Sequence, residues 1–253
     1  WDLRNRLAIR LADGTRGKST QEKPHVFEAD AIEDGGVALP AVLETCPVLS
    51  RLLEAESELR QQLNDVMPEL GLLRLEQAKV QVNEGGGGAF PYHFDLPLQD
   101  GSRRHLTALL YLNPAWEEGD GGEVEVLPLP FPTSKVAPRN AQLLVFSSVT
   151  TMHRVCPFVA KEPRVCVNLW FDGNISHPFP RPLCPQMHEE KVVSIINILR
   201  KNPPELRAFC KVWYRNEIAE SFRVAFQPSA ELDAALALHE EEADLTLERI
   251  SPA

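Results

Sequence analysis

The sequence predicts an α+β fold in which helices cover a β-sheet. Two segments, 106–112 and 164–171, alternate with a period of two residues, which is the pattern of β-strands. Both faces of the second segment carry side chains suited to burial, so we expect a closed or double sheet with a helical layer behind it. Apolar residues at helical spacing before and after these strands provide that layer.

The length and composition suit one domain with helical additions. The chain has 253 residues, of which 43% are hydrophobic, so it can bury a large core. We divide it into an N-terminal helical support segment (residues 1–72), a β-rich core (residues 73–175) and a C-terminal helical extension (residues 176–253).

Residues 40–73 are predicted to be helical. Their apolar residues recur near helical spacing among Glu, Arg and Gln, at Leu49, Leu52, Leu53, Leu59, Leu63, Val66 and Leu70. Such an amphipathic pattern packs on a sheet, and a helix that binds a partner is the alternative. The four glycines at 85–88 follow, and they suit either a lip over a site or a hairpin connection.

Three residues suggest a metal site. His93 and Asp95 are two apart, so a strand would direct both to one side. A distant His153 can return from a neighbouring strand as the third ligand. Two imidazoles and one carboxylate are the ligands of a ferrous centre that keeps open positions, although the same residues also suit a zinc hydrolase.

The strand at 106–112 alternates so that Thr107, Leu109 and Tyr111 share one face. We expect that face to point inward. The Tyr111 hydroxyl could then donate to a carboxylate in the site. An ordinary half-buried tyrosine that binds water is the alternative.

The strand at 164–171 places Arg164 on the face that it shares with Trp170. A guanidinium inside a sheet layer needs an anion, and its planar fork matches a carboxylate. Arg164 is therefore predicted to clamp the far carboxylate of a dicarboxylic cosubstrate.

Three helices are expected after the β-rich core, at 192–199, 204–226 and 230–247. Four prolines between 178 and 185 mark the extended connection that precedes them. The aromatic residues Phe209, Trp213, Phe222 and Phe226 should face the core. A dimer surface is the alternative.

Charge and cysteine content limit the partners. A net charge of −10 argues against a nucleic-acid surface, which needs Lys and Arg. The five cysteines contain no Cys-x-x-Cys pair, so we expect reduced thiols, which weakly favours a reducing compartment. No apolar run reaches the roughly 20 residues that span a bilayer. Because the chain begins at Trp1 rather than Met, the compartment stays open.

The chain resembles the prolyl 4-hydroxylase branch of the 2-oxoglutarate and Fe(II)-dependent dioxygenases, including the hypoxia-type prolyl hydroxylases, over about residues 79–173. The matching pieces are Tyr92-His93-Phe94-Asp95, Tyr111-Leu112-Asn113, Gly121-Gly122-Glu123-Val124, Leu143-Leu144-Val145-Phe146, His153, and Arg164 followed by Trp170. The resemblance departs at Asn83, where several family members carry a Tyr.

The resemblance implies a double-stranded β-helix (jelly-roll) barrel in the core. It assigns His93, Asp95 and His153 to iron, and Arg164 with Tyr111 to the C5 carboxylate of 2-oxoglutarate, with Thr107 and Trp170 lining the cosubstrate pocket. It further implies O2 as oxidant and ascorbate as the reductant that rescues iron, with succinate and CO2 as coproducts of hydroxylation.

The implied substrate is a prolyl residue in a peptide or protein. Neither a nucleic acid nor a membrane is expected as a partner. A free amino acid or another small molecule is the alternative, and a non-catalytic module that binds 2-oxoglutarate is a further one. The sequence leaves open the physiological substrate, the choice between 3- and 4-hydroxylation, and the oligomeric state.

Overall fold

The computed structural model describes residues 7–33, 37–38, 44, 47–96, 103–127, 129, 133–173 and 202–250. The strands are β1 (Ala8–Arg10), β2 (Arg16–Lys18), β3 (Val26–Glu33), β4 (Val37–Ala38), β5 (Arg74–Asn83), β6 (Gly88–His93), β7 (Leu106–Tyr111), β8 (Val124–Leu127), β9 (Ser134–Val136), β10 (Leu143–Ser147), β11 (Met152–Phe158) and β12 (Arg164–Asp172). The helices are α2 (Pro47–Glu54), α3 (Glu56–Val66), the 3-10 turn η2 (Pro68–Leu70), α5 (Pro203–Trp213), α6 (Arg215–Ala225) and α7 (Ala230–Ile250).

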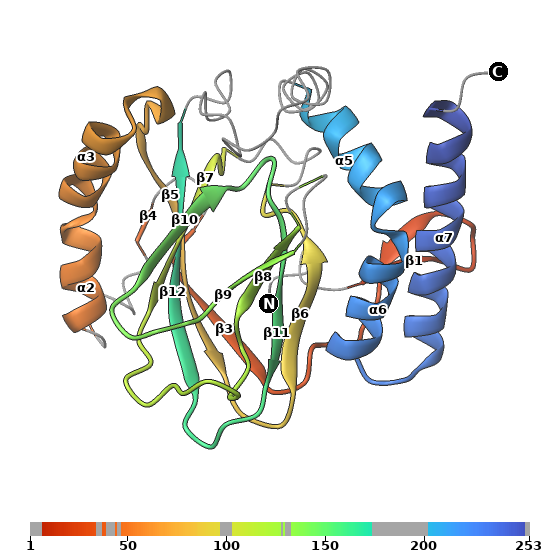
Figure 1. The fold of residues 1–253 in the computed structure, drawn as a ribbon, viewed down its shortest axis with the longest axis horizontal. Helices are drawn as coiled ribbons and strands as arrows, with labels where there is room; N and C mark the ends of the chain where they lie inside the picture. The colour runs from red at the N-terminus through yellow and green to blue at the C-terminus, as the bar shows by residue number, and fades with distance from the viewer. Residues whose placement is uncertain are drawn as a thin grey trace.

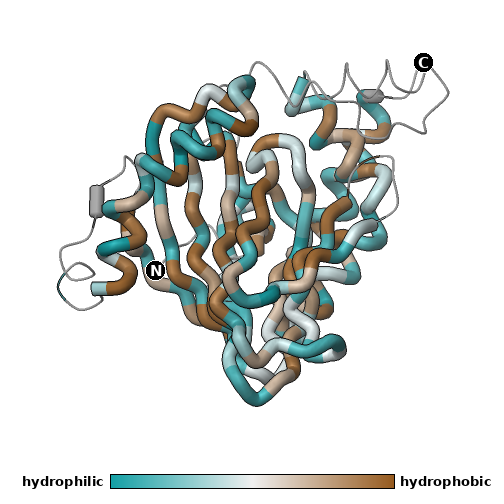
Figure 2. The backbone as a smooth tube through the Cα atoms, turned by 60° about the vertical axis from the view of Figure 1, so that its left-hand side comes forward, coloured by the Kyte–Doolittle hydropathy of each residue, from teal (hydrophilic) through white to brown (hydrophobic). Residues whose placement is uncertain are grey.

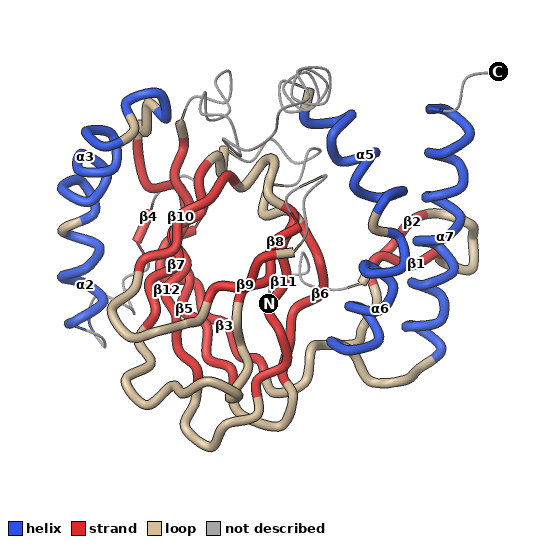
Figure 3. The backbone as a smooth tube through the Cα atoms, viewed as in Figure 1, coloured by secondary structure: helices blue, strands red, loops and turns tan. Residues whose placement is uncertain are grey.

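Two antiparallel sheets form the centre of the molecule. The larger has the order β10-β7-β12-β5-β3-β4, and the smaller has the order β6-β11-β8-β9. Figure 1 shows the two sheets facing each other, with α2 and α3 outside the larger sheet and α5, α6 and α7 beside the smaller one. Figure 3 shows the same separation of strands from helices. The α+β class is confirmed.

The expected barrel is not closed by hydrogen bonds within the described part of the chain. No ladder joins the two larger sheets there, and from β5 onward most consecutive strands cross from one sheet to the other. The glycine segment is one such crossing, since it connects β5 of the larger sheet to β6 of the smaller. Gly86 and Gly87 have φ of 99° and 93°, which only glycine adopts without strain. The segment lies at the end of β6 opposite His93, so it is a connection.

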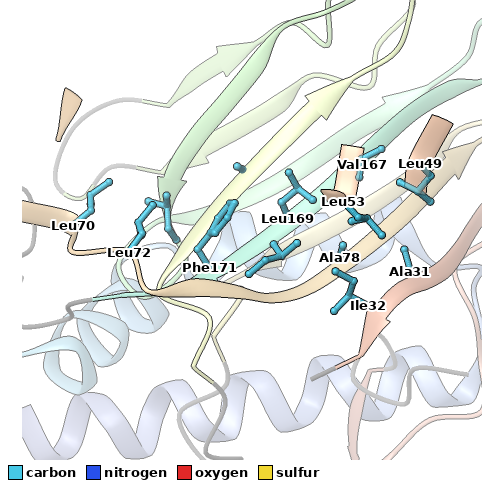
Figure 4. Close-up of a cluster of buried hydrophobic side chains, with 13 residues drawn as sticks. Ala31, Ile32, Leu49, Leu53, Leu70, Leu72, Ala78, Val167, Leu169 and Phe171 are labelled. Carbon is cyan, nitrogen blue, oxygen red and sulfur yellow. The ribbon is translucent and has the colours of Figure 1, made fainter. Parts of the chain in front are cut away.

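The larger sheet buries both of its faces. Val167, Leu169 and Phe171 of β12 pack with Leu106 and Ala108 of β7 against α2. Figure 4 shows this cluster, in which Leu49 and Leu53 of α2 meet the strand side chains. Figure 2 shows hydrophobic and hydrophilic residues interspersed along the strands. The predicted division of β12 into two faces is confirmed.

The predicted N-terminal helix is two helices and a 3-10 turn. α3 ends before Pro68, which lacks the N–H that a helix interior needs, and Gly71 then turns the chain into β5 with a φ of 51°. Leu52, Leu59 and Leu63 pack against the core as predicted. Val66 does not, because 71% of its surface is exposed at the end of α3.

The N-terminal segment also contributes strands that its sequence did not predict. β3 pairs along β5 from Val26↔Asn83 to Ile32↔Ala78, with a register shift between Asp30 and Ile32. That bulge and the acidic residues in the strand obscure its alternation. β3 therefore adds a strand to the larger sheet.

One helix predicted in the C-terminal extension is interrupted in the structure. The stretch 204–226 is two helices, α5 and α6, which meet at Tyr214, and α7 continues to Ile250. Phe226 is buried and Phe222 packs beside it. Phe209 is 38% and Trp213 66% exposed, so these two do not face the core. The predicted helix at 192–199 lies outside the described residues.

No described helix is long and apolar enough to cross a bilayer. Cys156, Cys166 and Cys210 are buried free thiols, as expected, and the other two cysteines lie outside the described residues.

Candidate active site

The two sheets bring the three predicted metal ligands together. His93 ends β6, and it lies opposite His153 of β11 in the ladder between these strands. Asp95 follows two residues after His93, just beyond the strand. Each residue offers one ligand atom, and these atoms all lie within 4.8 Å of one another. Asp95 Oδ1 is 3.2 Å from His93 Nε2 and 3.7 Å from His153 Nε2.

Backbone carbonyls orient both imidazoles. His93 Nδ1 lies 2.8 Å from the Pro91 oxygen, and His153 Nδ1 lies 3.2 Å from the Thr151 oxygen. A carbonyl only accepts, so each Nδ1 carries the proton and donates it. The Nε2 lone pairs are left to point at the common centre, which is the tautomer that a metal requires.

The Asp95 carboxylate is held by two donors on its other oxygen. Thr107 Oγ1 donates to Oδ2 at 2.7 Å, and Trp170 Nε1 donates to the same atom at 3.2 Å. Ser148 Oγ lies 2.7 Å from Thr107 Oγ1 and extends the network. Oδ1 therefore remains directed at the two histidines.

The mutual charges of the triad oppose the effect of burial. Burial alone would raise the pKa of Asp95, but His153 and His93 hold it far below its usual range. Burial lowers the pKa of His153 to about 4. Burial also acts to lower the pKa of His93, but the hydrogen bond and charge of Asp95 outweigh it and raise the pKa. An ionised carboxylate beside a neutral His153 suits a divalent cation.

The predicted cosubstrate residues form a second group of donors. Arg164 is 1% exposed, and it donates from Nε to the Gly122 oxygen at 2.8 Å and from Nη1 to Gln81 Oε1 at 3.1 Å. Its Nη2 and the Tyr111 hydroxyl have no hydrogen-bond partner in the described part of the chain. The Arg164 guanidinium carbon lies 5.3 Å from the centre of the Tyr111 ring.

These two atoms test whether an anionic cosubstrate fits. Buried polar atoms are nearly always paired, so two neighbouring donors with no partner imply an acceptor from outside the chain. Burial raises the pKa of Tyr111, despite the opposing charge of Arg164, so the hydroxyl keeps its proton. A neutral hydroxyl and a guanidinium are together matched to a carboxylate.

One cavity of about 370 Å³ joins the triad to Arg164, while Tyr111 lies outside its lining, next to the guanidinium. Its lining contains all three triad residues and Arg164. It also contains the pocket-facing side chains Gln81, Leu109, Cys166, Asn168 and Trp170. The inward set predicted for the strand at 106–112 is supported by Leu109 in this lining and by Thr107 at Asp95.

The structure places the two remaining predicted site residues differently. Trp170 lines the cavity and also donates to Asp95. Thr107 contacts Asp95 and Ser148 and is not part of the cavity wall as described, so its position is that of a carboxylate support.

The sequence did not predict that the Gln81 side chain and the Gly122 carbonyl accept hydrogen bonds from Arg164. A Cβ on Gly122 would lie 2.7 Å from the Arg164 Cδ, so only glycine lets this carbonyl reach the guanidinium. The Gly121-Gly122 pair was a visible signal. Gln81 carried none, because its position on β5 acquires meaning only when β12 pairs beside it.

Comparisons with known proteins agree with this geometry. The family model described as the 2OG-Fe(II) oxygenase superfamily matches residues 78–172. A prolyl 4-hydroxylase structure from Phytophthora capsici is 29% identical, with 89% of this chain and 73% of that chain covered and a TM-score of 0.68. The matched residues contain the whole triad and Arg164. Residues 78–172 belong to the 2OG-Fe(II) oxygenase superfamily.

Other structures resemble this oxygenase less. A prolyl hydroxylase from Trichoplax adhaerens, solved with a peptide fragment of the hypoxia-inducible factor oxygen degradation domain, is 23% identical, covering 67% of this chain and 71% of that one at a TM-score of 0.49. A Pseudomonas putida prolyl-4-hydroxylase is 24% identical, covering 66% and 77% at a TM-score of 0.46. No curated protein sequence matches the oxygenase.

The oxygenase is a 2-oxoglutarate-dependent dioxygenase that resembles prolyl 4-hydroxylases. Its cofactors are Fe(II) and 2-oxoglutarate. A zinc hydrolase would have no use for a buried guanidinium and hydroxyl beside the triad, whereas a dicarboxylic cosubstrate needs both.

Proposed function

We propose that this dioxygenase hydroxylates a prolyl residue in a peptide or protein and releases succinate and CO2. The prolyl substrate is supported by the 29% identity to a prolyl 4-hydroxylase across 89% of the chain. The two facing antiparallel sheets support a double-stranded β-helix as the finer description of the fold.

The unpaired donors of Arg164, which lines the cavity, and of Tyr111, whose ring lies beside the guanidinium, carry the proposal. In it, His93, Asp95 and His153 hold Fe(II), while Arg164 and Tyr111 bind the C5 carboxylate of 2-oxoglutarate. Two orphaned donors beside a three-ligand site are what a diacid that bridges metal and guanidinium requires. Trp170 would form the wall between these two groups.

The protein's own contribution is positioning and exclusion of water. Iron and 2-oxoglutarate, when bound, supply the oxidising chemistry. Thr107 and Trp170 fix the Asp95 carboxylate, and the carbonyls of Pro91 and Thr151 fix the imidazoles. Arg164, which lines the same cavity as the triad, would hold the carboxylate of 2-oxoglutarate and so orient it for chemistry at the metal site.

A direct test incubates the protein with Fe(II), 2-oxoglutarate, ascorbate and a library of proline-containing peptides. Mass spectrometry then measures an added oxygen on the peptide, and a parallel assay measures succinate. We expect both products, and we expect Asp95→Ala to lower both by roughly 100-fold or more, since loss of a ligand exceeds the usual effect of loss of an outer-shell partner.

Asp233→Ala is the matched control, because Asp233 is an exposed carboxylate in the first turn of α7. It should retain full activity. Oxygen incorporation into free proline or another small molecule, with no peptide modified, would overturn the peptide assignment. Unchanged succinate formation in Asp95→Ala would overturn the metal site.

A further inference from the structure

We propose that Arg207, which belongs to the C-terminal extension, is a positioning residue for the metal site. Its hydrogen bonds would fix the spacing between Asp95 and His153. This inference rests on the ligand set proposed above. Arg207 lies on α5, outside the residues that match the family model.

The Arg207 guanidinium bridges two separate segments of the chain. Its Nη1 donates to the Leu96 oxygen at 2.6 Å. Its Nε and Nη2 both donate to the Val149 oxygen, at 3.1 and 3.0 Å. The planar fork of arginine can address two carbonyls at once from fixed directions, which a lysine ammonium cannot do.

Both segments carry a proposed metal ligand. Leu96 directly follows Asp95, and Val149 lies in the turn that leads from β10 into β11, four residues before His153. The Leu96 N–H donates to the Ser148 oxygen at 3.1 Å, which ties the segments together beside the guanidinium. Arg207 thus strengthens a contact between the two segments that set the ligand separation.

The ring of Phe94 fixes the guanidinium from one side. The Arg207 guanidinium carbon lies 4.5 Å from the centre of that ring, and Phe94 stands between the ligands His93 and Asp95 in the sequence. Burial lowers the pKa of Arg207 to about 10, with the charge of Asp95 acting in the opposite direction. The side chain is therefore a cation at neutral pH, and its hydrogen bonds are charge-assisted.

Without the guanidinium, the carbonyls of Leu96 and Val149 lose these donors. The Leu96–Ser148 hydrogen bond and the network of Asp95, Thr107 and Ser148 still join the two segments, but nothing then links the carbonyls of Leu96 and Val149 through one rigid group, so the Asp95 carboxylate has more freedom to move relative to the His153 ring. Metal sites are sensitive to such supporting contacts, whose loss typically weakens metal binding by about 10–100-fold.

The test measures binding of Mn(II) alone to the full chain by electron paramagnetic resonance of the free ion. Arg207→Met keeps the apolar stem on Phe94 and removes the donors. We expect Mn(II) to bind this variant about tenfold or more weakly than the unmodified protein. Each variant is measured at a temperature at which circular dichroism shows it fully folded.

Lys211→Met is the matched control. Lys211 is one turn further along α5 and pairs with Glu242 of α7, so its loss disturbs the helical extension without touching either ligand segment. We expect its Mn(II) affinity to stay within about twofold of the unmodified protein, since separate sites act independently. Equal weakening in both variants would mean a general structural role and would overturn the proposal.

Arg207→Lys covers the case in which Arg207→Met does not fold. Lysine keeps the charge but reaches one carbonyl at a time, so its affinity should fall between the other two. Unmodified Mn(II) affinity in either Arg207 variant overturns the inference. His153→Ala separates the two hypotheses: if it also binds Mn(II) normally, the ligand set fails, and if only it loses Mn(II), the Arg207 inference alone fails.

Discussion

The larger sheet has two buried faces that differ in what they bury. On the face toward α2, Val167, Leu169 and Phe171 of β12 pack among other apolar side chains. On the face toward the cavity, the same strand presents Arg164 and Trp170 to the site. Adjacent residues of one strand therefore serve stability and chemistry separately.

The two faces differ in whether their buried atoms have all the contacts and hydrogen-bond partners they need when no ligand is bound. Apolar side chains need only contact, and Phe171 is fully buried with it. On the cavity face, Arg164 Nη2 and the Tyr111 hydroxyl are buried without partners in the described residues. Such unpaired atoms cost stability, so the cavity face is built for a bound anion and the helix face for the fold.

The largest expected effect on stability comes from the helix face. Phe171→Ala should lower the free energy of unfolding by about 3–5 kcal/mol, because it removes a fully buried ring. Phe27→Ala is the control, since Phe27 is 57% exposed and surface changes stay within about 0.5 kcal/mol. Chemical denaturation measures both. Equal losses would show that the helix face does not carry the core.

The largest expected effect on cosubstrate binding comes from Arg164. Arg164→Met should weaken 2-oxoglutarate binding by about 2–5 kcal/mol, or roughly 30-fold to several thousandfold, because it leaves a buried carboxylate without its cation. Calorimetric titration with Mn(II) in place of iron measures this without turnover. Arg139→Met, at an exposed arginine, should change nothing. Retained affinity in Arg164→Met would remove the clamp from the proposal.

Tyr111→Phe should have opposite effects on the stability of the fold and on the binding of 2-oxoglutarate. Without cosubstrate it should stabilise the fold by about 1 kcal/mol, because it removes a buried hydroxyl that lacks a partner. It should nevertheless weaken 2-oxoglutarate binding by about tenfold or more, since a hydrogen bond to a charged group is lost. Thermal unfolding with and without cosubstrate shows both signs. A destabilised ligand-free variant would mean that the hydroxyl has an internal partner.

The smallest expected effect is a pH dependence at the end of the sheet. His105 precedes β7, and its Nδ1 accepts from the Gly173 N–H at 2.9 Å. Burial lowers its pKa below 6.5, although Asp172 and Glu76 favour the charged form and Arg103 opposes it. The unfolded chain therefore binds more protons, and stability falls as the pH drops below about 6.5.

His105→Asn should reduce that fall, because it cannot be protonated and its side-chain oxygen can still accept from Gly173. Thermal unfolding between pH 7.5 and 5, read as the difference between the two proteins, isolates His105 from the other buried histidines. An identical slope in both proteins would show that His105 titrates normally.

Much of the site was predictable from local patterns. His93 and Asp95 are neighbours in the sequence, so their proximity required no tertiary information. Period-two alternation divided β12 correctly into two faces, and it placed Arg164 on the polar one. The spacing of the leucines in α2 and α3 predicted a helical layer. The prediction that Val66 packs in this layer was wrong, because Val66 is the last residue of α3 and is exposed.

What failed depended on contacts between distant segments. The acidic strand β3 is stabilised by pairing with β5, so its own alternation was too weak to predict it. The hydrogen bond from Thr107, predicted to line the pocket, to Asp95 also depends on such a contact, because it joins β7 to the residues after β6. Arg207 gave no signal, because its partners Leu96 and Val149 are backbone carbonyls.

The sequence by itself determined the strand periodicity, the identity of the polar side chains and the spacing of His93 and Asp95, because these follow from covalent geometry. Only the tertiary structure decided that His153 lies opposite His93, that the buried donors of Arg164 and Tyr111 lack partners in the described residues, and that a helical arginine bonds to both ligand segments. Those features arise from packing and hydrogen bonds between residues far apart in the chain, and no local pattern records them.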